Sequence, residues 1–258
     1  MAKAFIVGTG MTKFGKHLDR SLKSLAEEAA GQAMTDAQVS AEEVGMVFFG
    51  NAAGGLLTGQ ECVRGQTALR DTGLLGKPIV NVENACASSS SALSLAKMAI
   101  ESGQFECVLA VGAEKMYNAE DRMAPFRALE AAADLNELAE LKKRIGAEDG
   151  NPGSVFMDLY SDLARRFMER TGVTAEDYAR VAVKSRQHGL KNPKAQFHQD
   201  VDVKAVLESK MISEPLTLMM CSPIGDGSAA LVVCSEDFAK KKGLKAVEIR
   251  ASILRSGM

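Results

Sequence analysis

The sequence predicts an α/β protein in which a layered strand-and-helix domain is interrupted by a helical insertion. Over residues 1–117, short apolar runs typical of buried strands alternate with segments of helical periodicity. Residues 118–212 change character: prolines separate charged, amphipathic segments that we interpret as helices. Strand-like runs return over residues 213–258, which indicates that the chain goes back to the first domain.

The elements of the first domain follow from local signals. Residues 4–8 form an apolar run that ends in Gly8, so we expect a buried strand there. Leu22, Leu25, Ala29 and Ala33 recur at helical spacing and predict a helix over about residues 21–39. Further along, the patterns predict a strand at 46–50, a glycine-rich loop at 51–58, a helical segment at 64–72 and a strand at 78–82.

The later elements are predicted in the same way. Residues 87–103 combine small residues with apolar positions at helical spacing, and Gly103 is a stop signal. Residues 106–112 read as another buried strand. The insertion is expected to hold helices at 128–145, 154–171 and 175–189, the last with the capping pattern Thr174–Asp177. The chain then gives a strand at 229–234, a short helix near 235–242 and an alternating strand at 246–253.

Composition narrows the class of protein. The chain has 258 residues, 46% hydrophobic and 25% charged, and its net charge of -2 gives no electrostatic reason to expect nucleic acid as a partner. No run of about 18 apolar residues is present, so we expect no membrane span. The five cysteines are odd in number and lack CxxC spacing, so we expect a cytoplasmic protein without disulfides. With only three histidines, a His-rich metal site is not expected.

A cysteine stands at the junction of a predicted strand and a predicted helix. Residues 84–93 read Asn-Ala-Cys-Ala-Ser-Ser-Ser-Ser-Ala-Leu, which places Cys86 just ahead of the helix. The unpaired N–H groups and the positive end of the helix dipole favour a thiolate there. The backbone N–H of a nucleophile at such a turn can also face an oxyanion. From the cysteine alone, the alternative is a buried, inert thiol at the end of a strand.

Five stretches of this sequence resemble the thiolase superfamily of acetyl-CoA C-acyltransferases. Residues 59–64 (Gly-Gln-Glu-Cys-Val-Arg) and 81–88 (Asn-Val-Glu-Asn-Ala-Cys-Ala-Ser) resemble the segment that leads into the acylated cysteine of thiolases. Residues 102–116 resemble the next strand and its Gly–Glu–Met turn, and residues 221–230 (Cys-Ser-Pro-Ile-Gly-Asp-Gly-Ser-Ala-Ala) resemble the passage that returns the chain to the core. Residues 188–197 are similar to the sterol-carrier-protein (lipid-transfer) branch. The resemblance covers essentially the whole chain.

The resemblance implies a thiolase-like layered α/β/α fold. Its two similar halves each carry a mixed five-stranded sheet, and a loop domain inserted in the first half covers coenzyme A. We therefore expect residues 1–117 to begin the N-terminal half and residues 118–212 to be the loop domain. Residues 213–258 are expected to return to the N-terminal core and start the link to a C-terminal half that this sequence lacks.

By the same resemblance, Cys86 is the catalytic nucleophile. It takes the acyl group as a thioester, for thiolytic cleavage of a 3-ketoacyl-CoA or for Claisen condensation of acyl-CoA. Met157 and Tyr160 are candidates to line the acyl channel, with core packing as the alternative for the methionine. Coenzyme A is then a substrate and product, and no permanently bound cofactor is expected. The family is usually dimeric, so we expect a homodimer or larger oligomer, and some relatives in this branch work with a small zinc-ribbon/OB-fold protein.

The sequence also departs from the family pattern. The second half of a thiolase supplies the histidine that activates the cysteine, a further oxyanion residue and an acid/base cysteine, and no such motif occurs here. Ser89 stands where many thiolases have glycine, which is expected to tighten the pocket. Cys221 is a candidate to lie near the site, with the core as the alternative. The other histidines and cysteines are interpreted as surface residues (His17, His188, His198) and packing residues (Cys62, Cys107, Cys234).

Three functions stay open at this point. The first is an acyl-CoA C-acyltransferase, of which the chain is a fragment or one subunit. The second is a synthase or aldolase-type member of the same superfamily, although retention of Cys86 favours acyl transfer over an aldolase. The third is a non-catalytic, thiolase-like scaffold subunit. A partner chain or a longer gene that supplies the histidines would separate the first from the third.

Overall fold

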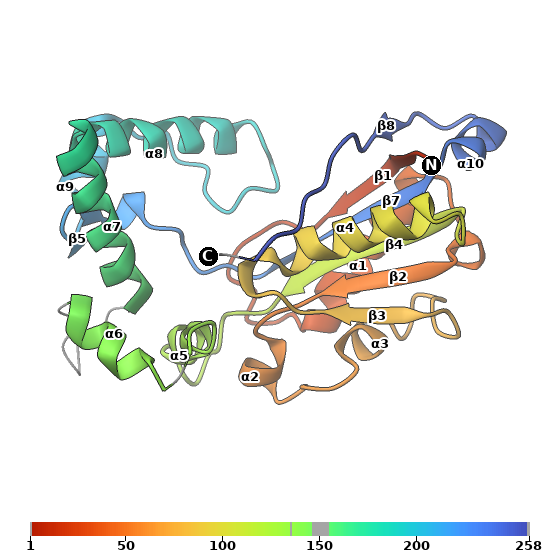
Figure 1. The fold of residues 1–258 in the computed structure, drawn as a ribbon, viewed down its shortest axis with the longest axis horizontal. Helices are drawn as coiled ribbons and strands as arrows, with labels where there is room; N and C mark the ends of the chain where they lie inside the picture. Colours follow the sequence, from red (N-terminus) through yellow and green to blue (C-terminus); the bar gives the residue numbers. More distant parts are fainter. Residues whose placement is uncertain (1, 135, 146–154, 257–258) are drawn as a thin grey trace. The chain divides into compact units, whose positions relative to one another are not determined.

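The computed structural model describes residues 2–134, 136–145 and 155–256 (Figure 1). The chain forms two compact units, one of residues 1–120 with 225–258 and the other of residues 121–224. The second unit thus ends later than the insertion expected at 118–212. The reason is local, because the hairpin of β5 (Met211–Ser213) and β6 (Leu216–Thr217) pairs only within itself. The role of the insertion as a loop domain over coenzyme A stays a prediction.

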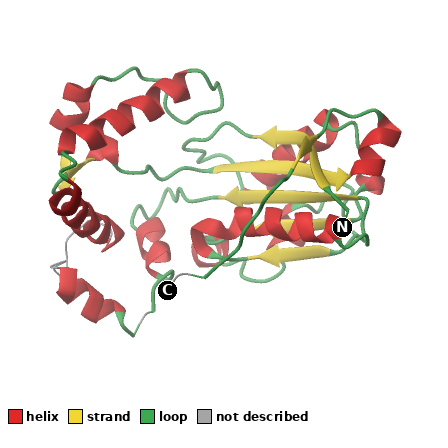
Figure 2. Cartoon of the chain, turned by 45° about the horizontal axis from the view of Figure 1, so that its top comes forward, coloured by secondary structure: helices red, strands yellow, loops and turns green. Residues whose placement is uncertain are grey.

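The first unit is built on one mixed sheet with the strand order β3-β2-β4-β7-β1-β8, whose strands lie side by side in Figure 2. Strand β2 pairs in parallel with both β3 and β4, whereas β7 runs antiparallel to β4 and to β1. The strands are β1 (Ala4–Met11), β2 (Met46–Gly50), β3 (Ile79–Val82), β4 (Cys107–Glu114), β7 (Gly227–Ser235) and β8 (Val247–Glu248). The expected five-stranded sheet is therefore extended by a short sixth strand at one edge.

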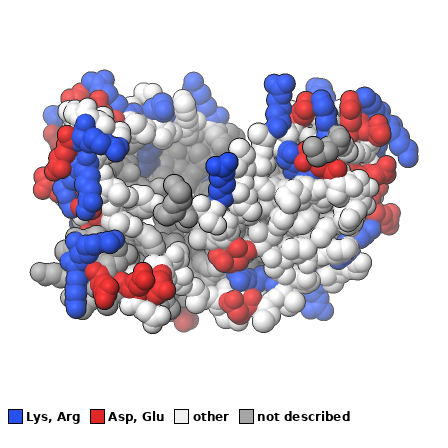
Figure 3. Space-filling view, viewed as in Figure 1, with Lys and Arg blue, Asp and Glu red and all other residues white. Residues whose placement is uncertain are grey.

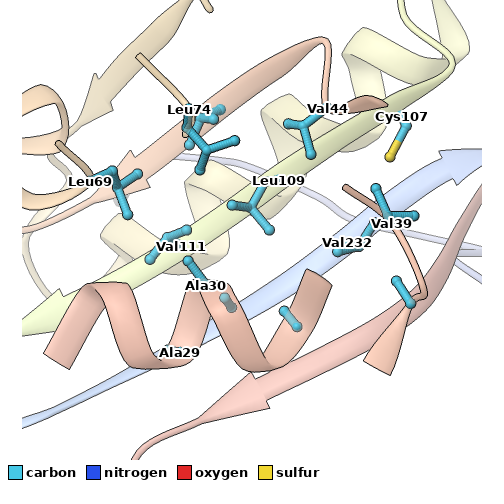
Figure 4. Close-up of a cluster of buried hydrophobic side chains, with 14 of the residues drawn as sticks. Ala29, Ala30, Val39, Val44, Leu69, Leu74, Cys107, Leu109, Val111 and Val232 are labelled. Atoms are coloured by element: carbon cyan, nitrogen blue, oxygen red, sulfur yellow. The ribbon is translucent and has the colours of Figure 1, made fainter. Parts of the chain in front are cut away.

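Helices cover both faces of this sheet, α1 (Leu22–Asp36) on one and α4 (Ser88–Glu101) on the other. The alternation of side chains along β4 explains the two layers. Leu109 and Val111 face the core that contains α1, which Figure 4 shows in detail, while Val108 and Ala110 face the core that contains α4. These layers confirm the predicted thiolase-like α/β/α fold.

Helix α1 approaches strand β1 closely because both carry small residues. A side-chain carbon added at Gly10 would lie 2.0 Å from the carbonyl oxygen of Ala29, and one added at Gly8 would lie 2.5 Å from Cβ of Ala37. The glycines therefore serve packing and do not end the strand. The pairing of β1 with β7 continues through Gly8 and Gly10 to Met11, so the strand does not stop at residue 8 as predicted.

Two further predictions in the first unit were wrong. The stretch 51–58 is not only a loop, because it contains the short helix α2, Gly54–Thr58, whose first residue donates its N–H to the side chain of Asn51 (3.1 Å). The strand expected at 246–253 is only β8. It pairs with Phe5 and Ile6 of β1, and since β1 begins at Ala4 the pairing runs out at once. The remaining helices are α3 (Arg64–Ala68) and α10 (Glu236–Lys242).

The second unit is mainly helical. The single helix expected at 128–145 is two helices, and the side chain of Asp134 accepts the N–H of Asn136 at 2.8 Å in the turn between them. The predicted cap of α8 is confirmed: Thr174 and Asp177 form a reciprocal capping box. The helices are α5 (Ala124–Glu130), α6 (Leu138–Ile145), α7 (Val155–Thr171), α8 (Ala175–Leu190) and α9 (Val203–Glu208), the last of which the sequence analysis missed. Over the described ranges, every helix is too short or too polar to cross a lipid bilayer.

Candidate active site

Cys86 lies where strand β3 gives way to helix α4. It occupies the middle of a short 3₁₀ turn, Ala85–Ala87, directly before the first residue of the helix, and its side chain is exposed. Because β3 is parallel to β2, and β2 to β4, the carboxyl ends of these three strands share one edge of the sheet. Cys86 is therefore not buried, unlike the thiol of the alternative interpretation, and its role as nucleophile stays a prediction.

The backbone just before the cysteine is unusual. Ala85 has φ of +44°, in the left-handed region that costs a residue with a side chain about 1 kcal/mol or more. Three hydrogen bonds hold this conformation. The N–H of Ala85 donates to Glu83 Oε1 (2.7 Å), the hydroxyl of Ser88 donates to the carbonyl of Ala85 (2.7 Å), and the N–H of Asn84 donates to that hydroxyl (2.9 Å). A strained turn held in this way is typical of a functional position.

A buried polar network lies at the ends of β2 and β4. Asn51 is 3% exposed, and its amide donates to the carbonyl of Ala113 (2.8 Å) while its side-chain oxygen accepts from Arg64 Nη1 (3.0 Å). The carboxylate of Glu114 accepts the backbone N–H groups of Ala52 and Ala53. Burial raises the pKa of Glu114 above its ordinary value, and these N–H groups oppose the rise only in part. The network fixes the chain where it leaves β2.

A second anchor joins the end of β4 to the beginning of β7. Asp226 is fully buried and accepts four hydrogen bonds. Its Oδ1 accepts the N–H groups of Met116 (2.7 Å) and Tyr117 (2.8 Å), and its Oδ2 accepts Lys115 Nζ (2.9 Å) and the N–H of His17 (3.0 Å). Asp226, Glu114 and Arg64 lie within the motifs that resemble the family, but the motifs alone assign them no role. For Asp226 and Glu114 the reason is that their partners are far away in the chain.

The other cysteines have different surroundings. Cys107 and Cys234 are buried as predicted, and burial raises the pKa of their thiols to about 12 and about 11. Cys221 is half-buried in the second unit, its thiol is 3.4 Å from the carbonyl of Thr217, and burial raises its pKa as well. Cys62 is exposed, so its interpretation as a packing residue was wrong. It lies in the loop between α2 and α3.

The remaining predicted site residues lie in the second unit or on the surface. Met157 is half-buried and Tyr160 is 57% exposed, one turn apart on α7, so their role in an acyl channel stays a prediction. The ring Nε2 of His17 is 2.8 Å from the carbonyl of Lys13, and that of His198 is 3.0 Å from the carbonyl of Ala195. His188 is exposed on α8.

Comparison with known proteins identifies the family. The model of the thiolase N-terminal domain matches residues 4–237. The chain is 34% identical over 258 residues to the benzoylsuccinyl-CoA thiolase subunit BbsB of Thauera aromatica, covering 99% of this chain and 61% of that protein. It is 35% identical to an acetyl-CoA acetyltransferase of Methanothermobacter thermautotrophicus (100% and 63% covered) and 33% identical to sterol carrier protein 2 of Bos taurus (99% and 46% covered).

A solved structure agrees with these sequence matches. The Ltp2-ChsH2(DUF35) aldolase superposes with a TM-score of 0.70 at 28% identity, over 94% of this chain and 58% of that chain. The chain thus spans 61% and 63% of the length of the first two curated relatives named above. Taken with the layered fold and the exposed cysteine ahead of α4, the matches show that the chain belongs to the thiolase family.

Proposed function

We propose that this chain carries the nucleophile of an acyl-CoA C-acyltransferase and that Cys86 accepts the acyl group as a thioester. The observation that carries the proposal is the exposed thiol of Cys86 on a left-handed, hydrogen-bonded turn at the beginning of α4. Membership of the thiolase family supports the choice of an acyl-CoA as substrate.

The two directions of the reaction share one acyl-cysteine intermediate. In thiolysis the thiolate of Cys86 attacks the 3-keto carbon of a 3-ketoacyl-CoA, a carbon–sulfur bond forms, the bond between carbons 2 and 3 breaks, and the departing carbanion takes a proton and leaves as acetyl-CoA. The thiol of a second coenzyme A then takes the acyl group and releases Cys86. In condensation the thiolate attacks the thioester carbon of an acyl-CoA, coenzyme A leaves as a thiol after taking a proton, and the carbanion of a second acyl-CoA then takes the acyl group and releases Cys86. N–H groups at the beginning of α4 can donate to the developing oxyanion.

We further propose that Met157 and Tyr160 of α7 contact the acyl group and that the second unit covers coenzyme A. Association with a second copy or with another protein is part of the same proposal. It is supported by large apolar side chains that stay exposed in the first unit: Met98, Val247, Ile253 and Leu254 are 58%, 68%, 78% and 54% exposed. The surface over α4 also shows few charged side chains (Figure 3). Exposed apolar surface of this kind marks interaction sites.

Two alternatives have specific support. The similarity to an aldolase that contains a DUF35 component favours an aldol-type reaction and a small partner protein of the zinc-ribbon/OB-fold kind. The similarity to a protein named as a thiolase subunit supports association with another chain, which a scaffold subunit would also need. The placement of Cys86 favours acyl transfer over both, because neither an aldolase nor a scaffold needs an exposed thiol at the beginning of a helix.

The test is covalent capture of the acyl group. The chain is incubated with acetyl-CoA, quenched in acid and analysed by intact mass and peptide mapping. We expect one acetyl group on Cys86 that neutral hydroxylamine removes, no adduct in Cys86→Ala, and an unchanged adduct in the matched control Cys62→Ala. Acetylation that maps elsewhere, or that survives in Cys86→Ala, would refute the proposal.

Turnover is a separate part of the proposal. Repeated acyl transfer needs a base beside the cysteine and further oxyanion donors, and the loss of one such donor alone costs on the order of a hundredfold in rate. We therefore propose that residues 1–258 alone acquire the acyl group but show little thiolysis of acetoacetyl-CoA. Rapid turnover, measured as loss of the enolate absorbance, would contradict this part and require a base among the residues interpreted as structural.

A further inference from the structure

The first turn of α4 rests on two glycines that lie beside each other in the sheet. Gly50, the last residue of β2, pairs directly with Gly112 of β4. In a twisted, side-chain-covered sheet, two adjacent glycines on the face toward a helix leave a gap. Here Ser88 and Ser89, the first two residues of α4, fill it.

The contact at Gly112 is closer than any side chain would allow, and the contact at Gly50 is tighter than almost all real side-chain contacts. A Cβ added at Gly112 would lie 2.0 Å from Ser89 Oγ and 2.8 Å from Ser89 Cβ. A Cβ added at Gly50 would lie 3.0 Å from the carbonyl carbon and oxygen of Ser88 and from Cα of Ser89. The contact at Gly112 therefore involves a side chain, whereas the contact at Gly50 involves the backbone. This difference makes the two positions separable by mutation.

The same serines connect the gap to the cysteine. The hydroxyl of Ser88 donates to the carbonyl of Ala85 and accepts the N–H of Asn84, so it binds the turn that carries Cys86. Movement of Ser88 away from the sheet must therefore disturb that turn. The end of β3 does not move with it, because β3 is paired to β2 as far as Val82. Any displacement would concentrate in the few residues around Cys86.

We propose that Gly50 and Gly112 are positioning residues for Cys86, and that Ser89 is the side chain matched to the space at Gly112. The pair fixes the height of the first turn of α4 above the sheet and with it the direction of the thiol. The consequence for acyl transfer rests on the proposed function, whereas the positioning itself does not.

The geometry predicts that a smaller residue at position 89 compensates for a larger residue at position 112. Carbon atoms in contact lie about 3.5–4.0 Å apart, so Gly112→Ala must push Ser89 Cβ away by roughly 1 Å. Ser89→Gly removes both close atoms and leaves only its Cα, 3.8 Å from the added Cβ, which is ordinary contact. The double variant Gly112→Ala/Ser89→Gly should therefore behave like the wild type. Gly50→Ala should resist rescue by Ser89→Gly, because its close neighbours are backbone atoms.

The experiment compares these chains with the wild type and with Gly31→Ala, a control glycine on α1 with no atom within 4 Å of an added Cβ. The first measurement is the rate of alkylation of Cys86 by iodoacetamide relative to Cys62 in the same chain. We expect a fall of about two- to fivefold in Gly112→Ala, because the thiol moves relative to the N–H groups of the first turn of α4. The ratio should return in the double variant and stay unchanged in Gly31→Ala. The second measurement is acetylation by acetyl-CoA, with an expected fall of about a hundredfold for a 1 Å misplacement.

Each outcome decides one of the two proposals. An alkylation ratio that is unchanged in Gly112→Ala, or lowered but not rescued by Ser89→Gly, overturns the positioning role. If Gly112→Ala does not fold, a folded double variant with the wild-type ratio supports the role and an unfolded one overturns it. Absence of acetylation in the wild type overturns the proposed function alone, because the alkylation ratio still reports on the positioning.

Discussion

Replacement of Asp226 by asparagine tests whether the end of β4 and the beginning of β7 are joined as the structure indicates. The carboxylate has a pair of donors on each oxygen: Met116 and Tyr117 N–H on Oδ1, Lys115 and His17 on Oδ2. Asparagine has the same shape but carries an NH₂ group in place of one oxygen. In either orientation of the asparagine amide, its NH₂ group faces two hydrogen-bond donors.

The expected loss in the free energy of unfolding is large because the site is buried. Asp226 has no exposed surface and the side chain of Lys115 is only 12% exposed. Loss of two hydrogen bonds to a charged group, each worth about 1.5–3 kcal/mol, agrees with the 3–5 kcal/mol that breaking a buried ion pair costs. We expect Asp226→Asn to lower the free energy of unfolding by about 4 kcal/mol, a large share of the roughly 5–15 kcal/mol typical of a domain.

Urea unfolding followed by far-ultraviolet circular dichroism measures this loss, since the chain has no tryptophan for fluorescence. Asp71→Asn is the matched control, because Asp71 forms an ion pair with Lys23 on the surface and its loss should change little. Lys115→Met should cost less than Asp226→Asn, since the carboxylate keeps its three backbone donors. If Asp226→Asn unfolds within about 1 kcal/mol of the wild type, Asp226 is not buried among these donors in solution.

Two more outcomes depend on titratable groups. In the folded chain iodoacetamide should label Cys86 first, with exposed Cys62 as its competitor. Cys107 and Cys234 should stay protected, because burial raises the pKa of their thiols to about 12 and about 11. Peptide mapping that finds Cys86 labelled no faster than Cys107 and Cys234 would count against its assignment as the nucleophile. Burial raises the pKa of Glu114, so the folded chain holds the proton of this carboxyl more tightly than the unfolded chain. The resulting contribution to the free energy of unfolding is complete below the ordinary carboxyl pKa of about 4.3 and is lost as pH rises through the higher pKa of the folded chain. The free energy of unfolding of the wild type should therefore fall relative to Glu114→Gln as pH rises from about 4, and a difference that is independent of pH would show that Glu114 is solvated.

The sequence predicts those parts of the fold that depend on neighbours along the chain. Strands β2 and β4 follow from their apolar runs, and the cap of α8 follows from Thr174 and Asp177. The position of Cys86 ahead of α4 follows from the change from strand to helix periodicity. In each case the deciding contacts lie within a few residues, where spacing determines which side chains meet.

The parts that could not be predicted depend on register between distant segments. Nothing near Gly50 indicates that Gly112 is its partner, because the pairing of β2 with β4 spans more than sixty residues. The four donors on Asp226 come from two other segments of the chain, and the left-handed backbone of Ala85 depends on hydrogen bonds to Glu83 and Ser88. The short length of β8 likewise depends on where β1 begins.

The arrangement of strands explains why a strained turn persists at Cys86. Parallel strands β2, β3 and β4 end at one edge of the sheet, and antiparallel β7 begins there, since Gly227 pairs with Glu114. The four segments at this edge are held by different forces: close packing at the glycines, buried hydrogen bonds at Asn51 and an ion pair at Asp226. A cost of about 1 kcal/mol at Ala85 is small beside these contacts, so the surroundings determine the turn and the turn cannot relax without disturbing them. A thiol on a turn held in this way keeps its direction through the backbone and stays exposed, as the proposed attack on a carbonyl requires.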